Sequence, residues 1–217
     1  MTQTALLGTA HPEHHPSAYP LWKKLCLLTA TYPGFGRIDS DISYLMGCSK
    51  LKQFVSTLRS MMEPDRFCAF CNPAMVDNPP IFENDLCALK WNDFPKRGLQ
   101  MLLIFPKAHL TGIAEVTPDH WAKAGELFQK ACWEFNLTGG GIVARFGDSR
   151  FHAGTMPHFH WNIICPDGSV EYRAPLSKTE PDRERNYKRL LGMIAEVKKL
   201  GGYEWLRSGE MRDFPDD

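Results

Sequence analysis

Residues 154–166 read GTMPHFHWNIICP, a stretch in which polar and apolar residues alternate. Successive side chains of a β-strand point to opposite faces. A strand here therefore puts His158, His160 and Asn162 on one face, while the residues between them form an apolar face. Imidazole is uncommon on a strand that needs only a wet face, because it titrates near neutral pH and binds metals. The alternation predicts a functional face on a packed apolar backing.

The length, charge and cysteines of the chain limit the class of protein. Its 217 residues suit one domain with elaborations, or at most two small domains. The 25 basic and 25 acidic residues cancel, so we expect neither nucleic acid nor an anionic membrane as a partner. No apolar run could span a membrane and the first residues lack a signal-peptide layout, so a cytoplasmic protein is expected. The 7 scattered cysteines predict reduced thiols rather than a disulfide framework.

Hydrophobic periodicity predicts an α+β fold built on an antiparallel sheet of about five strands. Apolar or alternating runs place strands at 81–83, 86–91, 99–105 and 142–146, in addition to the quoted stretch. The residues between the first two runs, Asn84-Asp85, are a hairpin signal. Thr117 and Pro118 open a helix that runs to about residue 136 and crosses between the third and fourth strands. A further short strand is expected at 170–173.

Four segments are expected along the chain. Residues 1–18 contain histidines and prolines without periodicity and predict a flexible tail. Residues 19–65 predict a helical extension, with helical stretches at 21–28 and from 42 to about 61. Residues 66–176 hold the strands and form the α+β domain, and residues 177–217 predict a charged C-terminal helix at 180–200 and a tail.

Several separated pieces occur in an order that resembles the histidine-triad superfamily of nucleotide hydrolases and transferases. The pieces are Pro-Lys-x-His (residues 106–109), a helix, a Gly-rich strand and His-x-His-x-Asn (residues 158–162). The resemblance covers residues 66–176, about half of the chain, and implies a catalytic domain of that fold. It also implies that His160, the middle histidine, attacks the α-phosphorus of a nucleotide and forms a covalent nucleotidyl-histidine.

The residue types suit this chemistry. A neutral imidazole can attack phosphorus and leave again, which splits one difficult displacement into two easier ones. Asn162 can donate a hydrogen bond to a phosphoryl oxygen, where negative charge develops. The superfamily has His or Gln at this third position, and an amide cannot act as an acid. Protonation of the leaving group would then fall to His152 or to water, or a good leaving group would need none.

Some features lie nearer to one branch of the superfamily. The amide at Asn162, the proline directly before the first histidine (Pro157) and a Cys-x-x-Cys resemble the branch of galactose-1-phosphate uridylyltransferase and diadenosine tetraphosphate phosphorylase. This branch passes the nucleotidyl group to a phosphate-containing acceptor. The likeness favours transfer over hydrolysis without deciding between them.

Cys68 and Cys71 form the Cys-x-x-Cys, which alone could be two buried thiols or a redox pair. Together with His109 and His158 they would make a Cys₂His₂ set suited to tetrahedral Zn²⁺. Zinc-bearing members of the superfamily use ligands at these places. Four protein ligands leave no open position for water, so we expect a structural zinc ion that stiffens the site.

Further residues are candidates for binding a nucleotide. Asp93 stands where related proteins carry an acidic residue that accepts from the ribose hydroxyls, although it could equally be a turn residue beside Asn92. Thr155 offers a hydroxyl to phosphate. Three basic residues could contact phosphates, although each alone is more often a solvated surface charge: Lys107, Arg145 and Arg150.

Two other functions stay open at this point. The first is a nucleotide-binding or scaffold protein that has lost catalysis, which the unusual Asn162 motivates. The second is a metal-dependent hydrolase in which His158, His160 and His152 bind a catalytic metal. The expected partner is a nucleotide or nucleotide conjugate. A homodimer through a continuous sheet is also expected from the resemblance, unless the helical extensions cap that surface.

Overall fold

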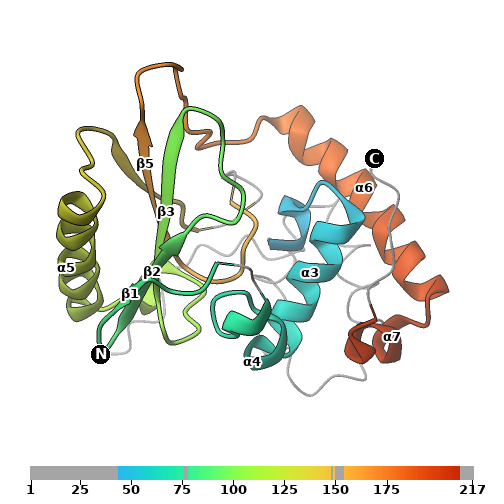
Figure 1. Ribbon diagram of the computed structural model, residues 1–217. Coiled ribbons are helices and arrows are strands. Elements are labelled where there is room, and N and C mark those ends of the chain that lie inside the picture. Colours follow the sequence, from blue (N-terminus) through green and yellow to red (C-terminus); the bar gives the residue numbers. More distant parts are fainter. Residues whose placement is uncertain (1–43, 76–77, 148, 150–153, 211–217) are drawn as a thin grey trace, which may run out of the picture.

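The computed structural model describes residues 44–75, 78–147, 149 and 154–210. Its centre is one sheet of five antiparallel strands in the order β1-β2-β3-β5-β4 (Figure 1). The strands are β1 (Phe82–Glu83), β2 (Cys87–Trp91), β3 (Leu99–Pro106), β4 (Gly141–Ala144) and β5 (Trp161–Pro166). The expected α+β class and five-stranded antiparallel sheet are confirmed. The expected strand at 170–173 was wrong, because those residues form no strand.

The hairpin between β1 and β2 forms where the sequence predicts it. Phe82 pairs with Leu89 across the two strands. The side-chain oxygen of Asn84 accepts hydrogen bonds from the backbone N–H groups of Leu86 and Cys87, at 3.2 and 2.9 Å. Asparagine thus fixes the turn through its own side chain.

Helix α5 (Pro118–Glu134) covers one face of the sheet (Figure 1). Its first turn is capped by Thr117, whose hydroxyl accepts from the backbone N–H of His120. The core between helix and sheet includes the apolar face predicted for the quoted stretch. Its buried members include Leu102, Ile104, Leu127, Ala131, Phe159, Trp161 and Ile163.

Strand β5 begins at Trp161, later than the sequence pattern predicts. The preceding segment is held by the chain that follows β3. The backbone N–H of Phe159 donates to the Leu110 carbonyl at 2.6 Å, and the His158 ring donates to the Pro106 carbonyl at 2.9 Å. The two histidines therefore lie on the approach to the sheet, while Phe159 between them belongs to the same buried core as Trp161 and Ile163.

The opposite side of the sheet from α5 carries a helical module, which we define as residues 44–62 with α6 (Glu180–Lys199) and α7 (Gly202–Ser208) (Figure 1). The long helix expected from residue 42 to 61 is interrupted. Residues 44–47 are helical, residues 48–50 are not, and α3 begins afresh (Leu51–Met62). The buried core of the module is separate from that under α5 and includes Leu45, Phe54, Leu58, Leu190, Ile194, Val197 and Leu206.

Buried Arg59 ties α7 to α3. Its guanidinium donates to the carbonyls of Leu206 and Glu210 at 2.8 and 3.0 Å, near the C-terminal end of α7. The last carbonyls of a helix generally lack partners within the helix, and a cation is favourable there. The sequence did not predict α7, since Gly201-Gly202 was expected only to end the preceding helix.

The helix α4 (Pro64–Phe67) and the single turn η2 (Pro73–Met75) flank the Cys-x-x-Cys. A second single turn, η3 (Ile113–Glu115), lies between β3 and α5. The expected tail at 1–18 and the helical stretch at 21–28 lie outside the described residues. Among the described helices, none has both the length and the apolar character needed to cross a bilayer.

Candidate active site and metal centre

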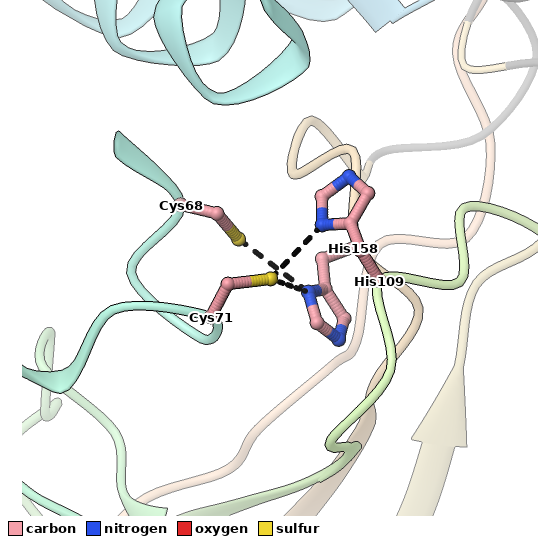
Figure 2. Close-up of side chains that lie close together, drawn as sticks. All are labelled: Cys68, Cys71, His109 and His158. Atoms are coloured by element: carbon pink, nitrogen blue, oxygen red, sulfur yellow. Dashed lines mark hydrogen bonds between the residues drawn. The ribbon is translucent and has the colours of Figure 1, made fainter. Parts of the chain in front are cut away.

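Four predicted metal ligands come together although they lie on three separate segments (Figure 2). Cys68 and Cys71 follow α4, His109 follows β3, and His158 precedes β5. Their four ligand atoms all lie within 4.8 Å of one another. The Cys71 Sγ atom is 3.2 Å from His109 Nδ1 and 3.6 Å from His158 Nδ1.

This set fits a tetrahedral ion. With Zn–S of about 2.3 Å and Zn–N of about 2.0 Å, tetrahedral geometry puts sulfur and nitrogen ligands about 3.5 Å apart. Three of the four sulfur–nitrogen separations are 3.2, 3.4 and 3.6 Å. Two thiols and two imidazoles are also the donor types that zinc prefers. The cluster could therefore hold a metal ion.

The ring of His158 is oriented for this role. It is fully buried, and its Nε2 atom lies 2.9 Å from the Pro106 carbonyl. A carbonyl only accepts, so Nε2 carries the proton and Nδ1 is the free lone pair that faces the cysteine sulfurs. Such a backbone partner on the far nitrogen is typical of metal-binding histidines.

The two thiols have opposite pKa shifts. Burial alone would raise the pKa of Cys68, but the neighbouring His109 and His158 side chains outweigh it and lower the pKa to about 4. Burial and the nearby Cys68 raise the pKa of Cys71 to about 12. The pocket without a cation thus favours one thiolate and opposes a second, and a divalent cation would stabilise both.

The predicted nucleophile, His160, is held in one tautomer. Its Nδ1 atom is 2.8 Å from the carbonyl oxygen of His158, so Nδ1 donates and the Nε2 lone pair is free. Its ring lies against Phe70, with ring centroids 5.4 Å apart. Burial, as the largest cause, lowers the pKa of His160 to about 4. The imidazole is therefore neutral near pH 7.

Asn162 lies on β5, on the face away from α5. Cross-strand pairing places it in one row with Lys90, Leu103 and Val143. Its side-chain nitrogen donates one hydrogen bond, at 3.1 Å, to the carbonyl of Val143. An amide nitrogen has two hydrogens, so one remains for a ligand.

Asp93 is paired with a lysine that the sequence analysis did not single out. Lys90 is only 1% exposed, and its Nζ atom lies 2.7 Å from Asp93 Oδ2. The other carboxylate oxygen accepts from Asn78 at 3.1 Å. The carboxylate is thus oriented by two donors, and its side chain remains 22% exposed.

Arg145 and Lys107, which were predicted to contact phosphates, lie in different parts of the structure. Arg145 donates to the Pro175 carbonyl at 3.1 Å, and its charge is close enough to help lower the pKa of His160. Lys107 instead contacts the β1–β2 hairpin, at 3.2 Å from the Asn84 carbonyl and 3.7 Å from a Glu83 carboxylate oxygen. His152 and Arg150, the other predicted contacts, lie outside the described residues.

Thr155 is linked to the helical module. The Nε2 atom of Gln53, on α3, donates to the Thr155 hydroxyl oxygen at 2.7 Å. The hydroxyl of Thr57 reaches the Thr155 carbonyl at 3.5 Å. The helical extension lies outside the part of the chain that the resemblance covers, and neither contact was predicted.

Three residues of the site were missed by sequence reasoning: Lys90, Gln53 and Phe70. Lys90 had a usable signal, because it stands inside an apolar strand with an aspartate three positions later. Phe70, between the two cysteines, stacks on Phe105 at 4.6 Å and lies edge-on to His158 at 5.0 Å. Gln53 had no local signal, since its partner is 102 residues away.

Comparisons with known proteins find similarity only among solved structures. No protein-family model matches the chain, and no curated protein gives a significant match. A zinc-bound histidine triad family protein from Mycobacterium smegmatis is 21% identical, with a TM-score of 0.41, over 61% of this chain and 96% of that one. A hypothetical histidine triad nucleotide-binding protein from Sulfolobus tokodaii is 20% identical, with a TM-score of 0.38, over 63% and 97%.

A third similar structure is a diadenosine triphosphate hydrolase from Plasmodium falciparum. It is 16% identical, with a TM-score of 0.36, and the match covers 55% of this chain and 76% of that one. These likenesses concern the fold of distant sequences, and at such TM-scores they decide nothing about chemistry. The chemistry has to be argued from the residues of this chain.

Proposed function

We propose that this protein is a nucleotide hydrolase or nucleotidyltransferase that cleaves its substrate at the α-phosphate through a nucleotidyl-His160 intermediate. The observation that carries the proposal is the hydrogen bond from His160 Nδ1 to the His158 carbonyl, at 2.8 Å. This bond fixes the tautomer, so the Nε2 lone pair is available for attack. The likeness of the motif to the histidine-triad superfamily adds to it.

The proposed reaction has two steps. In the first, the Nε2 lone pair of His160 forms a bond to the α-phosphorus, and the bond from phosphorus to the leaving-group oxygen breaks with its electron pair on that oxygen. In the second, an oxygen of water or of an acceptor bonds to phosphorus, and the electron pair of the P–N bond returns to Nε2. The attacking water or hydroxyl loses its proton to solvent or to a nearby base.

The remaining residues would bind and orient the substrate. The free N–H of Asn162 and the guanidinium of Arg145 are suited to phosphoryl oxygens, on which charge develops. The oriented carboxylate of Asp93 is suited to the two hydroxyls of a ribose. Zn²⁺ held by the Cys₂His₂ cluster would serve as a structural ion, and its ligands would fix the segment that carries His160.

A second candidate is a nucleotide-binding protein of the same fold with little or no turnover. One observation favours it, because the Asn162 amide already donates to the Val143 carbonyl within the sheet. An amide used for strand pairing contributes less to a transition state. This candidate predicts measurable nucleotide affinity with no covalent adduct.

Trapping the intermediate tests the leading proposal. The protein is mixed with p-nitrophenyl esters of the four nucleoside monophosphates, quenched in base, where P–N bonds to histidine persist, and weighed by intact-mass spectrometry. We expect a mass gain of one nucleotidyl group in the wild type and none in His160→Asn. His120→Asn is the matched control, since this helix-cap histidine lies on α5, and it should retain the adduct. Turnover that survives unchanged in His160→Asn would exclude the proposal.

A product assay then separates transfer from hydrolysis. Inorganic phosphate or a sugar phosphate is added during turnover, and the products are identified by chromatography. Transfer predicts the nucleoside diphosphate or nucleotide sugar, whereas hydrolysis predicts the monophosphate alone.

A further inference from the structure

One side chain of the helical module that contacts the candidate site is Gln53. Its Nε2 atom donates to the hydroxyl of Thr155 at 2.7 Å. Thr155 precedes His160 by five residues. The next residue, Met156, packs against the cluster that contains Phe70, whose ring lies against His160. The module therefore reaches the segment that borders the nucleophile.

The orientation of the Gln53 amide is fixed by the chain itself. Its Oε1 atom accepts from the backbone N–H of Ser49 at 3.1 Å. A backbone N–H can only donate, so the oxygen of the amide must face Ser49 and the nitrogen must face Thr155. The break in the helix at residues 48–50 leaves this N–H available, and Gln53 satisfies it from the first turn of α3.

The Thr155 hydroxyl is consequently an acceptor in this contact. A hydroxyl has one hydrogen to donate, and here the oxygen receives a hydrogen from Gln53. The hydroxyl hydrogen is then directed away from Gln53. The methyl group of Thr155 lies close to Gly47. If this glycine carried a Cβ atom, that atom would lie only 3.2 Å from the methyl group. Packing and hydrogen bonding thus fix the position of the hydroxyl.

We propose that Gln53 is a positioning residue, which holds the Thr155 hydroxyl so that its hydrogen points to a phosphoryl oxygen of the bound nucleotide. This inference rests on the proposed function. It gives the helical module a part in the reaction, because a side chain outside the α+β domain sets the direction of a donor inside the site. A donor that is oriented before the substrate arrives costs no reorganisation during the reaction.

The proposal predicts an unusual order of effects for two substitutions. In Gln53→Glu the carboxylate still accepts from Ser49 but also accepts the Thr155 hydrogen, which turns that donor away from the substrate. In Gln53→Met the hydroxyl loses its partner but remains free to donate. Glutamate at this helix position is favourable for folding, so the variant predicted to be more stable is the one predicted to be less active.

The test measures kcat and KM for the p-nitrophenyl nucleotide ester that the wild type turns over, together with the thermal midpoint of each variant. We expect Gln53→Glu to lower kcat by about 100-fold, the lower end of the loss that removal of one oriented donor causes, and Gln53→Met to lower it less than about 5-fold.

A second background separates hydroxyl orientation from charge repulsion. In Thr155→Val there is no hydroxyl to turn, so Gln53→Glu and Gln53→Met should have equal kcat there. Equal loss in both Gln53 variants when threonine is present would overturn the inference, and so would a Gln53→Glu defect that persists in the Thr155→Val background. Both results leave the proposed function intact. Absence of turnover by the wild type would instead remove the proposed function and this inference with it.

Discussion

At the scale of single residues, His158 links the metal centre to the nucleophile. Its ring takes part in the Cys₂His₂ cluster while its Nε2–H donates to the Pro106 carbonyl. Its own carbonyl oxygen accepts from His160 Nδ1. One residue therefore sets the position of a metal ligand and the tautomer of the proposed nucleophile, so displacement of either should disturb the other.

We predict that replacing Lys90 and replacing Asp93, which form a buried pair, lower the free energy of unfolding by different amounts. Asp93→Asn leaves a buried ammonium without its charge partner, and we expect a loss of about 3 to 5 kcal/mol in the free energy of unfolding. Lys90→Met leaves a carboxylate that water can still reach, so its loss should be smaller. The double variant should return to within about 1 kcal/mol of the wild type.

Urea denaturation of the wild type, the two single variants and the double variant measures these differences in the free energy of unfolding. The double variant serves as the control that separates pairing from packing. Equal losses for the two single variants, or losses that simply add in the double variant, would show that the pair does not act as described. The same set also tells whether lower activity in Asp93→Asn reflects nucleotide binding or stability.

The buried thiol of Cys48 should make the free energy of unfolding fall at alkaline pH. Burial, as the largest cause, raises the pKa of this thiol from 9.0 to about 11. Because the folded pKa exceeds the unfolded one, the contribution is complete below pH 9 and is lost as the pH rises towards 11. Two pH units correspond to roughly 2 to 3 kcal/mol. Unfolding free energies of wild type and Cys48→Ala, measured from about pH 8 to about pH 11, should converge by that amount.

Parallel pH profiles for the two proteins would contradict this account of Cys48. Cys132→Ala is the matched control, because this thiol is only partly buried and lies on α5 rather than in the helical module. Its profile should stay parallel to that of the wild type.

At the scale of elements, the short segment after α4 carries two of the four candidate metal ligands. It places Cys68, Phe70 and Cys71 against the sheet with little regular structure of its own. We therefore predict that the purified protein contains one zinc ion per chain, which elemental analysis can measure. Removal with a chelator should lower the thermal midpoint, since metal binding free energy contributes to folding.

Cys71→Ser sharpens this prediction. We expect it to lose the zinc ion and most of the chelator-sensitive part of the stability. Cys132→Ser, which lies outside the cluster, should keep both. A wild-type protein that holds no zinc and whose thermal midpoint is unaffected by chelators would show that the four residues are a metal-free cluster.

Several elements could be predicted from sequence because their signals are local. Thr117 and Pro118 define the start of α5, and Asn84 defines the first hairpin. The four members of the Cys₂His₂ cluster were also predicted together, because the resemblance joined His109 and His158 to the Cys-x-x-Cys. The start of β5 was placed too early, because alternation continues through His158 and Phe159 while their hydrogen bonds go to the chain after β3.

At the scale of the whole molecule, the described residues form three buried clusters. One lies between α5 and the sheet, a second lies within the helical module, and the third contains Phe70 and Phe105 beside the candidate site. Helical periodicity showed that α3 and α6 have apolar faces, but it does not say which helices pair. Contacts between segments more than 100 residues apart, such as Gln53 with Thr155, therefore could not be predicted from either segment alone.

The sheet and the helical module should affect the proposed reaction in different ways. Asn162 lies on the sheet and His160 and Asp93 lie next to its strands, whereas the helical module adds contacts on the side of Thr155. We expect variants of the sheet residues to alter chemistry with every nucleotide. Variants of the module should alter the reaction through Thr155.

The stereochemical course at phosphorus tests the central claim most directly. A nucleotide ester with a phosphorothioate of known configuration at the α-position is turned over in isotopically labelled water or with a labelled acceptor, and the configuration of the product is determined. Each displacement inverts phosphorus, so attack by His160 followed by a second attack predicts net retention. Net inversion would mean that the acceptor attacks directly and would contradict a nucleotidyl-His160 intermediate.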